Sequence, residues 1–308
     1  MLKNSGAPTQ GVGVCWRGRS IRGIQGILSP QRLLLCELIL KLAILTATDI
    51  RHRYFVNALR KAMPVGAVVF QDTGYMPAET KVGELDAKTA SVLKHHFDER
   101  TRQETAYFGH DAEMVADSAG CRVFHRTTET LNGKGTVNDL NEAGIDTVVV
   151  YGTSLIKSPL IDSFGRRMIN MHLGLSPYYR GTATNFYPLV NGEPEYVGLT
   201  IHHIDPGIDS GDILHQGRPV ITAEDLPHTV GCKTILIGIE LMIQTLRELE
   251  AGTLTAVPQW KVENPRLYLR KDYHPEQVVR LYEIIEAGLF RDYAARRDAV
   301  EAWVRLVP

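Results

Sequence analysis

The sequence predicts an α/β fold with a doubly wound, mostly parallel sheet and helices on both faces. Leu42–Leu45 and Val65–Phe70 are short apolar runs typical of buried strands, and Arg51–Lys61 between them carries apolar residues at helical spacing. A strand, a helix and a strand of these lengths form a βαβ unit, which requires a parallel sheet. The same alternation continues as far as His172, which favours a Rossmann-like architecture.

Each element follows from a local pattern. Thr46–Asp49 supplies a turn and a helix N-cap, and Asp146–Tyr151 is so rich in β-branched residues that we expect an internal strand. The other expected elements are a charged helix over Asp86–Phe108, a strand over Arg122–Phe124, short helices near Val137–Ala143 and Ser158–Asp162, strands over Met168–His172, Val197–Ile204 and Ile213–Ile221, a long helix over Leu226–Leu249, and one or two helices from Pro275 to the end.

Charge and composition divide the chain into three regions. Its 308 residues carry 34 Lys and Arg against 35 Asp and Glu, a net charge of −1. Residues 1–41 hold six basic groups and one acid, so we expect a basic and poorly ordered N-terminal extension. Residues 42–255 form the predicted α/β domain, and residues 256–308 form a C-terminal appendage with an extended segment and helices.

The composition argues against several classes of partner. A near-zero net charge does not indicate a nucleic-acid partner, because a dominant basic face is missing. The four cysteines are scattered without a CxxC pair, so neither a zinc cluster nor a disulfide framework is predicted. No apolar run reaches the ~20 residues of a membrane helix. We therefore expect a cytoplasmic protein that binds no metal, nucleic acid or membrane.

Two passages carry the polar residues of a candidate site. Asn170 and His172 lie two residues apart at the end of a predicted strand, so their side chains share a face. An amide donor beside an imidazole can hold a developing oxyanion while the imidazole transfers a proton. A later loop presents Asp205, Asp209 and Asp212. One of these carboxylates could pair with His172, raise its pKa and shuttle protons.

Both passages resemble the signatures of the formyltransferases that use 10-formyltetrahydrofolate. The first is Asn170-x-His172 with a loop that ends in Pro177-x-x-Arg180-Gly181. The second is Gly198-x-Thr-x-His202 with Asp205-x-Gly-x-Asp209-x-Gly211-x-Ile213. The resemblance covers residues 42–250 and implies that residues 42–255 are a formyltransferase catalytic domain. One departure concerns the loop after His172, where many members of that family have a serine and this chain has Gly174.

The resemblance implies a mechanism and a set of site residues. Asn170 and His172 would stabilise the tetrahedral oxyanion formed when an amine attacks the formyl carbon, and Asp209 would hold His172 protonated and accept the amine proton through a water. The cosubstrate is 10-formyltetrahydrofolate, and no metal is required. The implied folate pocket consists of Tyr151, Gly152, Thr153, Leu155, Ile156, Asp205, Gly207 and Ile208, and the implied supporting or substrate-contacting residues are His202, Ser176, Arg180 and Tyr178.

The acceptor amine is predicted from what the chain lacks. The turn 46–53 has no glycine-rich phosphate loop of the kind used by enzymes that formylate glycinamide ribonucleotide. Residues 256–308 are too short for the β-barrel of methionyl-tRNA formyltransferases, and residues 1–41 are too short for the regulatory domain of formyltetrahydrofolate hydrolases. A small-molecule amine, and specifically a nucleotide-linked amino sugar, is the expected acceptor. A methionyl-tRNA formyltransferase-like enzyme, a formyltransferase of hydroxyornithine-type amino acids, and a hydrolase stay open, as does a homodimer.

Overall fold

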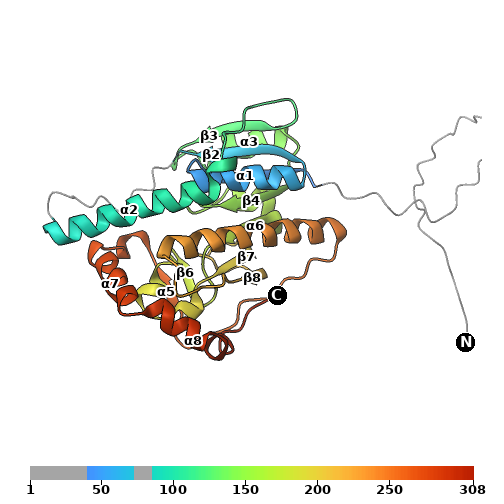
Figure 1. Ribbon diagram of the computed structural model, residues 1–308. Helices are drawn as coiled ribbons and strands as arrows, with labels where there is room; N and C mark the ends of the chain where they lie inside the picture. The colour runs from blue at the N-terminus through green and yellow to red at the C-terminus, as the bar shows by residue number, and fades with distance from the viewer. Residues whose placement is uncertain (1–39, 73–84) are drawn as a thin grey trace, which may run out of the picture. The chain divides into compact units, whose positions relative to one another are not determined.

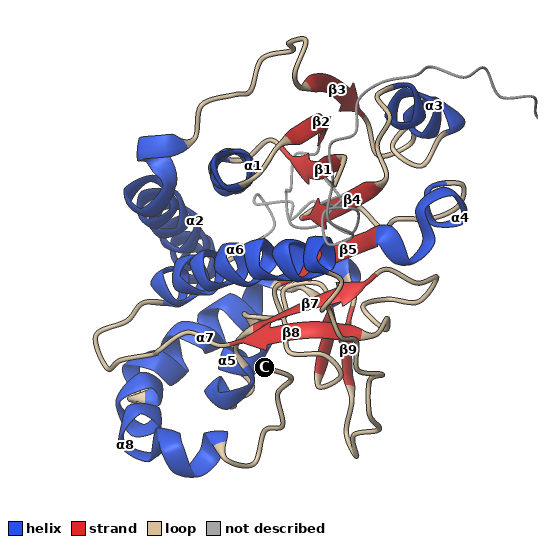
Figure 2. Ribbon diagram, turned by 90° about the vertical axis from the view of Figure 1, so that its right-hand side faces the viewer, coloured by secondary structure: helices blue, strands red, loops and turns tan. Residues whose placement is uncertain are grey.

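The computed structural model describes residues 40–72 and 85–308. Except for residues 40 and 41, the predicted basic extension lies outside this range. Within it, seven strands form one sheet in the order β3-β2-β1-β4-β5-β7-β8 (Figures 1 and 2). The strands are β1 (Leu42–Ala47), β2 (Val65–Gln71), β3 (Arg122–Arg126), β4 (Thr147–Tyr151), β5 (Met168–His172), β7 (Leu199–His203) and β8 (Ile213–Gly217).

The sheet is parallel from β3 to β5 and antiparallel from β5 through β7 to β8. This arrangement confirms the predicted mostly parallel fold, with β4 as an internal strand between β1 and β5. The strand expected to reach Ile221 ends at Gly217. Pro219 follows two residues later, and proline cannot donate a hydrogen bond to a neighbouring strand.

Helices cover both faces of the sheet, as a doubly wound fold requires. Helices α1 (Ile50–Ala62), α2 (Ala87–Phe108) and α6 (Pro227–Ala251) lie on one side, and α3 (Lys134–Glu142) and α4 (Leu160–Phe164) lie on the other (Figure 2). Successive residues of β1 alternate between the two cores: Leu42 and Ile44 pack toward α1, whereas Ala43 and Leu45 pack toward α3. Asp49 stands at the predicted N-cap of α1, but its side chain makes no capping bond and accepts instead from Arg51.

Helix α6 is a long apolar helix that lies against the sheet. It is the one helix in the described part of the chain with the length and hydropathy of a membrane span, and half of its most apolar window is buried within the fold. The sequence expectation that no segment has this character therefore does not hold for α6. Its apolar residues, among them Ile235, Ile239 and Met242, instead belong to the core beneath β5 and β7.

The C-terminal residues are built onto the same compact unit as the α/β domain. Strand β9 (Arg266–Tyr268) pairs in parallel with β6 (Tyr179–Gly181), which follows the loop after β5. Helices α7 (Pro275–Glu286) and α8 (Leu289–Glu301) pack against α5 (Tyr187–Val190) through a separate apolar cluster. One or two helices after Pro275 were predicted, and the structure has two, whereas the pairing of β6 with β9 was not predicted.

Candidate active site

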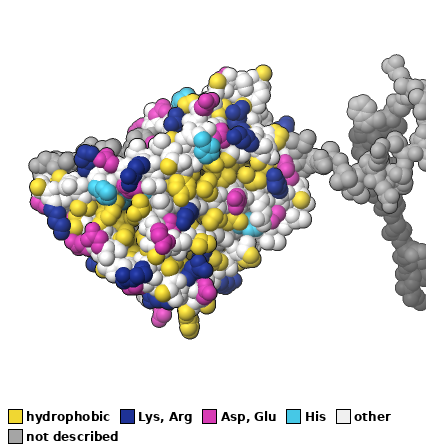
Figure 3. Space-filling model, in the orientation of Figure 1, with side chains coloured by type: hydrophobic (Ala, Val, Ile, Leu, Met, Phe, Trp, Pro, Cys, Tyr) yellow, Lys and Arg dark blue, Asp and Glu magenta, His cyan; other side chains and the backbone are white. Residues whose placement is uncertain are grey.

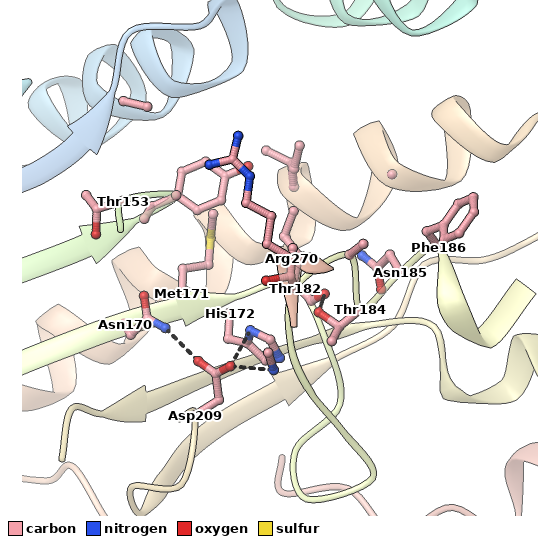
Figure 4. A pocket seen from close by; sticks show the side chains of 18 of the residues that line it. Thr153, Asn170, Met171, His172, Thr182, Thr184, Asn185, Phe186, Asp209 and Arg270 are labelled. Atoms are coloured by element: carbon pink, nitrogen blue, oxygen red, sulfur yellow. Dashed lines mark hydrogen bonds and ion pairs between the residues drawn. The ribbon is translucent and has the colours of Figure 1, made fainter. Parts of the chain in front are cut away.

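A cavity of about 730 Å³ lies at the carboxyl ends of β1, β4 and β5. Its wall combines the loops after these strands with the loop between β7 and β8, the inner sides of α2 and α6, and the turn after β9 (Figure 4). Open α/β sheets bind ligands at this edge, because the strand ends and the following loops converge there.

Asn170, His172 and Asp209 meet at the inner end of this cavity (Figure 4). The His172 Nδ1 lies 3.4 Å from the Asp209 Oδ2, and the Asn170 Nδ2 lies 3.5 Å from the Asp209 Oδ1. The pairing of β5 with β7 places His202 opposite Asn170, with 3.1 Å between the His202 Nε2 and the Asn170 Nδ2. The structure therefore brings together the three predicted catalytic residues and His202.

His202 lies between Asn170 and Asp209. Its Nδ1 lies 2.8 Å from the backbone oxygen of His203, and its Nε2 lies 3.1 Å from the Asn170 Nδ2 and 3.6 Å from the Asp209 Oδ1. With its nitrogen directed at His202 and Asp209, the Asn170 amide turns its oxygen away from Asp209 (Figure 4). The 3.5 Å bond to Asp209 is long, so this N–H is available to a better acceptor.

The Asp209 carboxylate is ionised. Burial by itself would raise its pKa, but His172, His202 and a 2.8 Å hydrogen bond from the Gly181 N–H together lower that pKa well below its ordinary value. Asp209 also adopts a left-handed backbone conformation, with φ of 48°, which costs a non-glycine residue energy. The loop that carries this buried charge therefore needs hydrogen bonds that hold its backbone in this conformation.

Two side chains supply that support by donating to the Asp209 backbone oxygen. The Ser176 hydroxyl donates at 3.2 Å, and the Gln259 amide donates at 2.7 Å and also reaches the Gly211 oxygen at 2.9 Å. Ser176 was predicted as a site residue, but it lies buried beneath the loop and does not line the cavity. Gln259 lies outside both sequence motifs and was not predicted.

The expectation that Asp209 holds His172 protonated is wrong in direction. Burial lowers the pKa of His172 below its ordinary value, and this effect outweighs the attraction of Asp209. The ring is only 6% exposed. Its Nε2 lies 3.2 Å from the Tyr179 backbone oxygen, so each ring nitrogen faces an acceptor although the neutral ring carries one proton. If His172 takes up a second proton, both N–H groups of the ring therefore have a hydrogen-bond acceptor, Asp209 for Nδ1 and the Tyr179 oxygen for Nε2.

The predicted folate-pocket residues all line the cavity: Tyr151, Gly152, Thr153, Leu155, Ile156, Asp205, Gly207 and Ile208. Gln71, at the end of β2, fixes the first of these loops, because it accepts from the Ser154 N–H at 2.7 Å and donates to the Ser154 hydroxyl at 2.9 Å. Gly152 is required by close packing, since a Cβ there would lie 2.2 Å from the His52 Nε2.

Two other predicted residues, Tyr178 and Arg180, do not line the cavity. Tyr178 packs on Trp260 and Tyr196, and its hydroxyl accepts from the Arg305 N–H at 3.0 Å. It therefore anchors the C-terminal segment and does not contact a ligand in the cavity. Arg180 is also absent from the cavity lining, although it lies near enough to lower the pKa of His172. Arg180 lies in β6 and Tyr178 directly precedes that strand, which pairs with β9.

Sequence reasoning missed the outer end of the cavity. This end is lined by His96, Phe97 and Arg100 of α2, His228 of α6, Asn185, Phe186, Arg270 and Tyr273. No local motif links these residues, which come from four separate segments. Arg51 also lines the cavity, and it is bonded to both Glu104 oxygens at 3.1 Å and to Asp49 at 2.9 Å.

Known proteins resemble this chain in both sequence and fold. A methionyl-tRNA formyltransferase of Listeria monocytogenes is 36% identical over 118 residues, which are 38% of this chain and 37% of that protein. The chain thus spans little more than a third of the length of this curated relative.

Two solved structures share the fold. A phosphoribosylglycinamide formyltransferase of Anaplasma phagocytophilum has a TM-score of 0.50 and 15% identity, and the match covers 75% of this chain and 98% of that one. A sugar N-formyltransferase of Shewanella sp. also has a TM-score of 0.50 and 15% identity, over 78% of this chain and 87% of that one.

The sequence model described as formyl transferase matches residues 69–246, which include β5, β7 and the loop between β7 and β8 that carries Asp209. Because this match covers more than half of the chain, the protein belongs to the formyl transferase family.

Proposed function

We propose that this protein transfers the formyl group of 10-formyltetrahydrofolate to the primary amine of a small molecule, a nucleotide-linked amino sugar. The observation that carries the proposal is the meeting of Asn170, His172 and Asp209, all within 3.5 Å of a neighbour in the set, at the inner end of the cavity. An amide, an imidazole and a carboxylate in contact supply an oxyanion donor and a proton acceptor in one place.

The cavity wall suits a folate. Tyr151–Ile156 and the loop 205–209 offer backbone groups, while Met171, Ile204 and Ile208 supply apolar surface between them. Such a wall fits a flat heteroaromatic ring with amide-like edges. The backbone groups can bond to the polar edges of the ring, and the apolar side chains can pack on its faces. The folate, when bound, supplies an activated formyl group.

The protein's own residues handle the protons and the developing charge. Asp209, ionised, orients His172 and attracts a proton to it. His172, neutral at rest, takes the proton released by the attacking amine and later returns it to the folate nitrogen that loses the formyl group. While it holds this proton, the imidazolium donates from Nδ1 to Asp209 and from Nε2 to the Tyr179 oxygen. Asn170 exchanges its long bond to Asp209 for a bond to the oxygen that becomes negative.

The free space in the cavity and the surface charge of the protein support a small acceptor. The cavity continues from His172 past Phe186 toward α2, which leaves space for a second ligand beside the folate. On the face shown in Figure 3, basic and acidic side chains are interspersed and do not form a basic field. A tRNA backbone is bound through such a field, and the near-neutral net charge of −1 for the whole chain supports a small-molecule acceptor.

The test is a panel of amines offered with 10-formyltetrahydrofolate, with each product read by mass spectrometry. The panel contains nucleotide-linked amino sugars, hydroxyornithine, glycinamide ribonucleotide and initiator methionyl-tRNA. We expect a formyl product with an amino sugar, formed in step with free tetrahydrofolate. Formate released at one rate with and without any amine would identify a hydrolase, and formylation of the tRNA alone would refute the small-molecule proposal.

A further inference from the structure

Three residues lie in one row across β5, β7 and β8: His172, Thr200 and Gln216. Strand pairing places Thr200 opposite His172 and Gln216 opposite Thr200. Residues directly opposite each other in neighbouring strands project from the same face of a sheet. His172 lines the cavity, whereas Thr200 and Gln216 are buried and do not line it. The row therefore leads from the inner end of the cavity to β8, the last strand in the order of the sheet.

The Thr200 hydroxyl joins two backbone groups of the loop that follows His172. It donates to the Gly174 oxygen at 2.7 Å and accepts from the Ser176 N–H at 3.0 Å. Gly174 packs against the His172 ring, since a Cβ there would lie 2.4 Å from the His172 Nε2. Thr200 is completely buried, so solvent does not supply a replacement for its hydroxyl. The hydroxyl therefore fixes the backbone that packs against His172.

The same loop is bonded to the loop that carries Asp209. The Ser176 hydroxyl donates to the Asp209 backbone oxygen at 3.2 Å, and Ser176 is also completely buried. The Asp209 carboxylate in turn lies 3.4 Å from the His172 Nδ1. Both partners of the contact between His172 and Asp209 thus depend on the position of the backbone at Ser176.

The Gln216 side chain holds this backbone from below the loop. Its Nε2 donates to the Ser176 oxygen at 2.7 Å and to the Thr200 hydroxyl at 3.0 Å, which uses both N–H groups of the amide. Its Oε1 accepts from the Val307 N–H at 3.1 Å. Because a backbone N–H can only donate, Val307 keeps the amide oxygen on its own side and directs the amide nitrogen toward Ser176 and Thr200.

Val307 belongs to the segment after α8, which is bonded to the outer edge of β8. The Gln216 N–H donates to the Val307 oxygen at 2.8 Å, and the Val307 side chain is buried. Two residues earlier, the Arg305 N–H donates to the Tyr178 hydroxyl at 3.0 Å. Val307 is therefore held by contacts other than the Gln216 amide, and it can set the orientation of that amide.

We propose that Gln216 is a positioning residue that holds His172 and Asp209 in contact. It acts through the loop after β5, and the Val307 N–H fixes its amide in the orientation that this requires. The proposal rests on the proposed function, since the contact affects turnover only if His172 and Asp209 take part in it. It also gives the segment after α8 a part in formyl transfer, although residues 302–308 do not line the cavity.

The test uses variants of the full chain. Gln216→Met removes the amide and keeps the length of the side chain, and Val307→Pro removes the N–H that orients the amide. Thr200→Val removes the hydroxyl and keeps the shape of the side chain, whereas Thr200→Ser keeps the hydroxyl. Thr245→Val is the matched control, because Thr245 is also completely buried and its hydroxyl donates at 2.7 Å to the Leu241 oxygen within α6, outside this network.

The first measurement is steady-state formyl transfer. We expect Gln216→Met and Thr200→Val to lower kcat at least tenfold, and Val307→Pro at least fivefold, while KM for both substrates stays within threefold of the wild type. Thr200→Ser should keep kcat within threefold of the wild type, and Thr245→Val within twofold. A kcat within twofold of the wild type in a folded Gln216→Met variant, or an equal loss in Thr200→Val and Thr245→Val, would overturn the proposal.

The second measurement, amide hydrogen exchange read by mass spectrometry without ligands, does not depend on turnover. Peptides that cover residues 173–177 and 205–211 should exchange at least tenfold faster in Gln216→Met than in the wild type, and at the wild-type rate in Thr245→Val. Unchanged exchange of both peptides in Gln216→Met would overturn the proposal. If exchange changes as expected but the wild type formylates no amine, the proposed function fails and the role of Gln216 in holding the two loops stands.

Discussion

Replacing Gly174 by alanine should displace His172, the histidine that we propose takes part in proton transfer. A Cβ at this position would lie 2.4 Å from the His172 Nε2 and 2.6 Å from the Thr184 Cβ, where side chains do not approach within 3.0 Å. Neither neighbour moves easily, because His172 is bonded to the Tyr179 oxygen and Thr184 donates to the Leu173 oxygen at 2.5 Å. To reach an ordinary contact of 3.4 Å, the ring must move by about 1 Å.

A displacement of about 1 Å at a reacting group can cost on the order of 100-fold in rate, and overpacking costs about 2 kcal/mol of stability. We therefore expect Gly174→Ala to lower kcat by ten- to 100-fold and Tm by roughly 4–8 °C. Gly174→Ser, which introduces the residue that many family members have, should do the same.

The assays are steady-state formyl transfer and thermal unfolding followed by circular dichroism. Gly135→Ala in α3 is the matched control, because a Cβ there meets nothing within 4 Å, and it should leave kcat unchanged. If both Gly174 variants keep kcat within twofold of the wild type and Tm within 1 °C, the packing argument for His172 is refuted.

Three further predictions concern residues around the site. Gln259→Ala removes two hydrogen bonds to the catalytic loop, which should cost about 2 kcal/mol in urea unfolding and lower kcat more than tenfold as Asp209 loses its anchor. Gln71→Leu frees the Ser154 loop and should raise KM for the folate with a smaller change in kcat. Between pH 7.5 and 5.5, stability should fall by roughly 1.4 kcal/mol for each of His96 and His228, because the unfolded chain binds protons near pH 6.5 whereas the folded chain does not until about pH 3.

Each of these has a control. Gln244→Ala removes a single exposed bond to Glu248 and should change neither stability nor kcat; an equal loss in both glutamine variants would contradict the anchoring role of Gln259. An unchanged folate KM in Gln71→Leu would show that the Ser154 loop does not bind the folate. A His96→Phe, His228→Phe double variant that loses as much stability in acid as the wild type would exclude these two residues as the cause.

The fold was predictable because its signals are local. Apolar runs of strand length and helices of 3.6-residue spacing each occupy a continuous stretch, and the β-branched run at Thr147–Tyr151 indicated an internal strand. The short strands β6 and β9 carry no such signal. Their pairing joins segments more than 80 residues apart and depends on tertiary packing.

The meeting of Asn170, His172 and Asp209 was predictable from the sequence, although the protonation of His172 was not. Three aspartates in one loop are equivalent in the sequence, but Asp205 binds Ser210 and the Gly207 N–H, and Asp212 binds Arg166, which leaves Asp209 to contact His172. Family resemblance had pointed to Asp209, which is the aspartate of this loop that contacts His172 and Asn170. The lowered pKa of His172 follows from burial, which spacing along the chain does not show.

The residues of the outer end could not be found from the sequence. Asn185, His228 and Arg270 lie on three segments that meet because α6 crosses the sheet and β9 pairs with β6. Individually, each is an ordinary polar residue. The role of Gln259 likewise follows only from its hydrogen bonds to the Asp209 and Gly211 backbone oxygens, which the sequence does not show.

The central claim is that Asp209, through His172, carries proton transfer in folate-dependent formyl transfer. The most direct measurement is the single-turnover rate of formyl transfer in Asp209→Asn, which keeps the size of the side chain and removes its charge, with folate binding and circular dichroism as controls. We expect a rate lower by 100- to 10,000-fold with folate affinity within threefold of the wild type. A rate within tenfold of the wild type in a folded, folate-binding variant would contradict it.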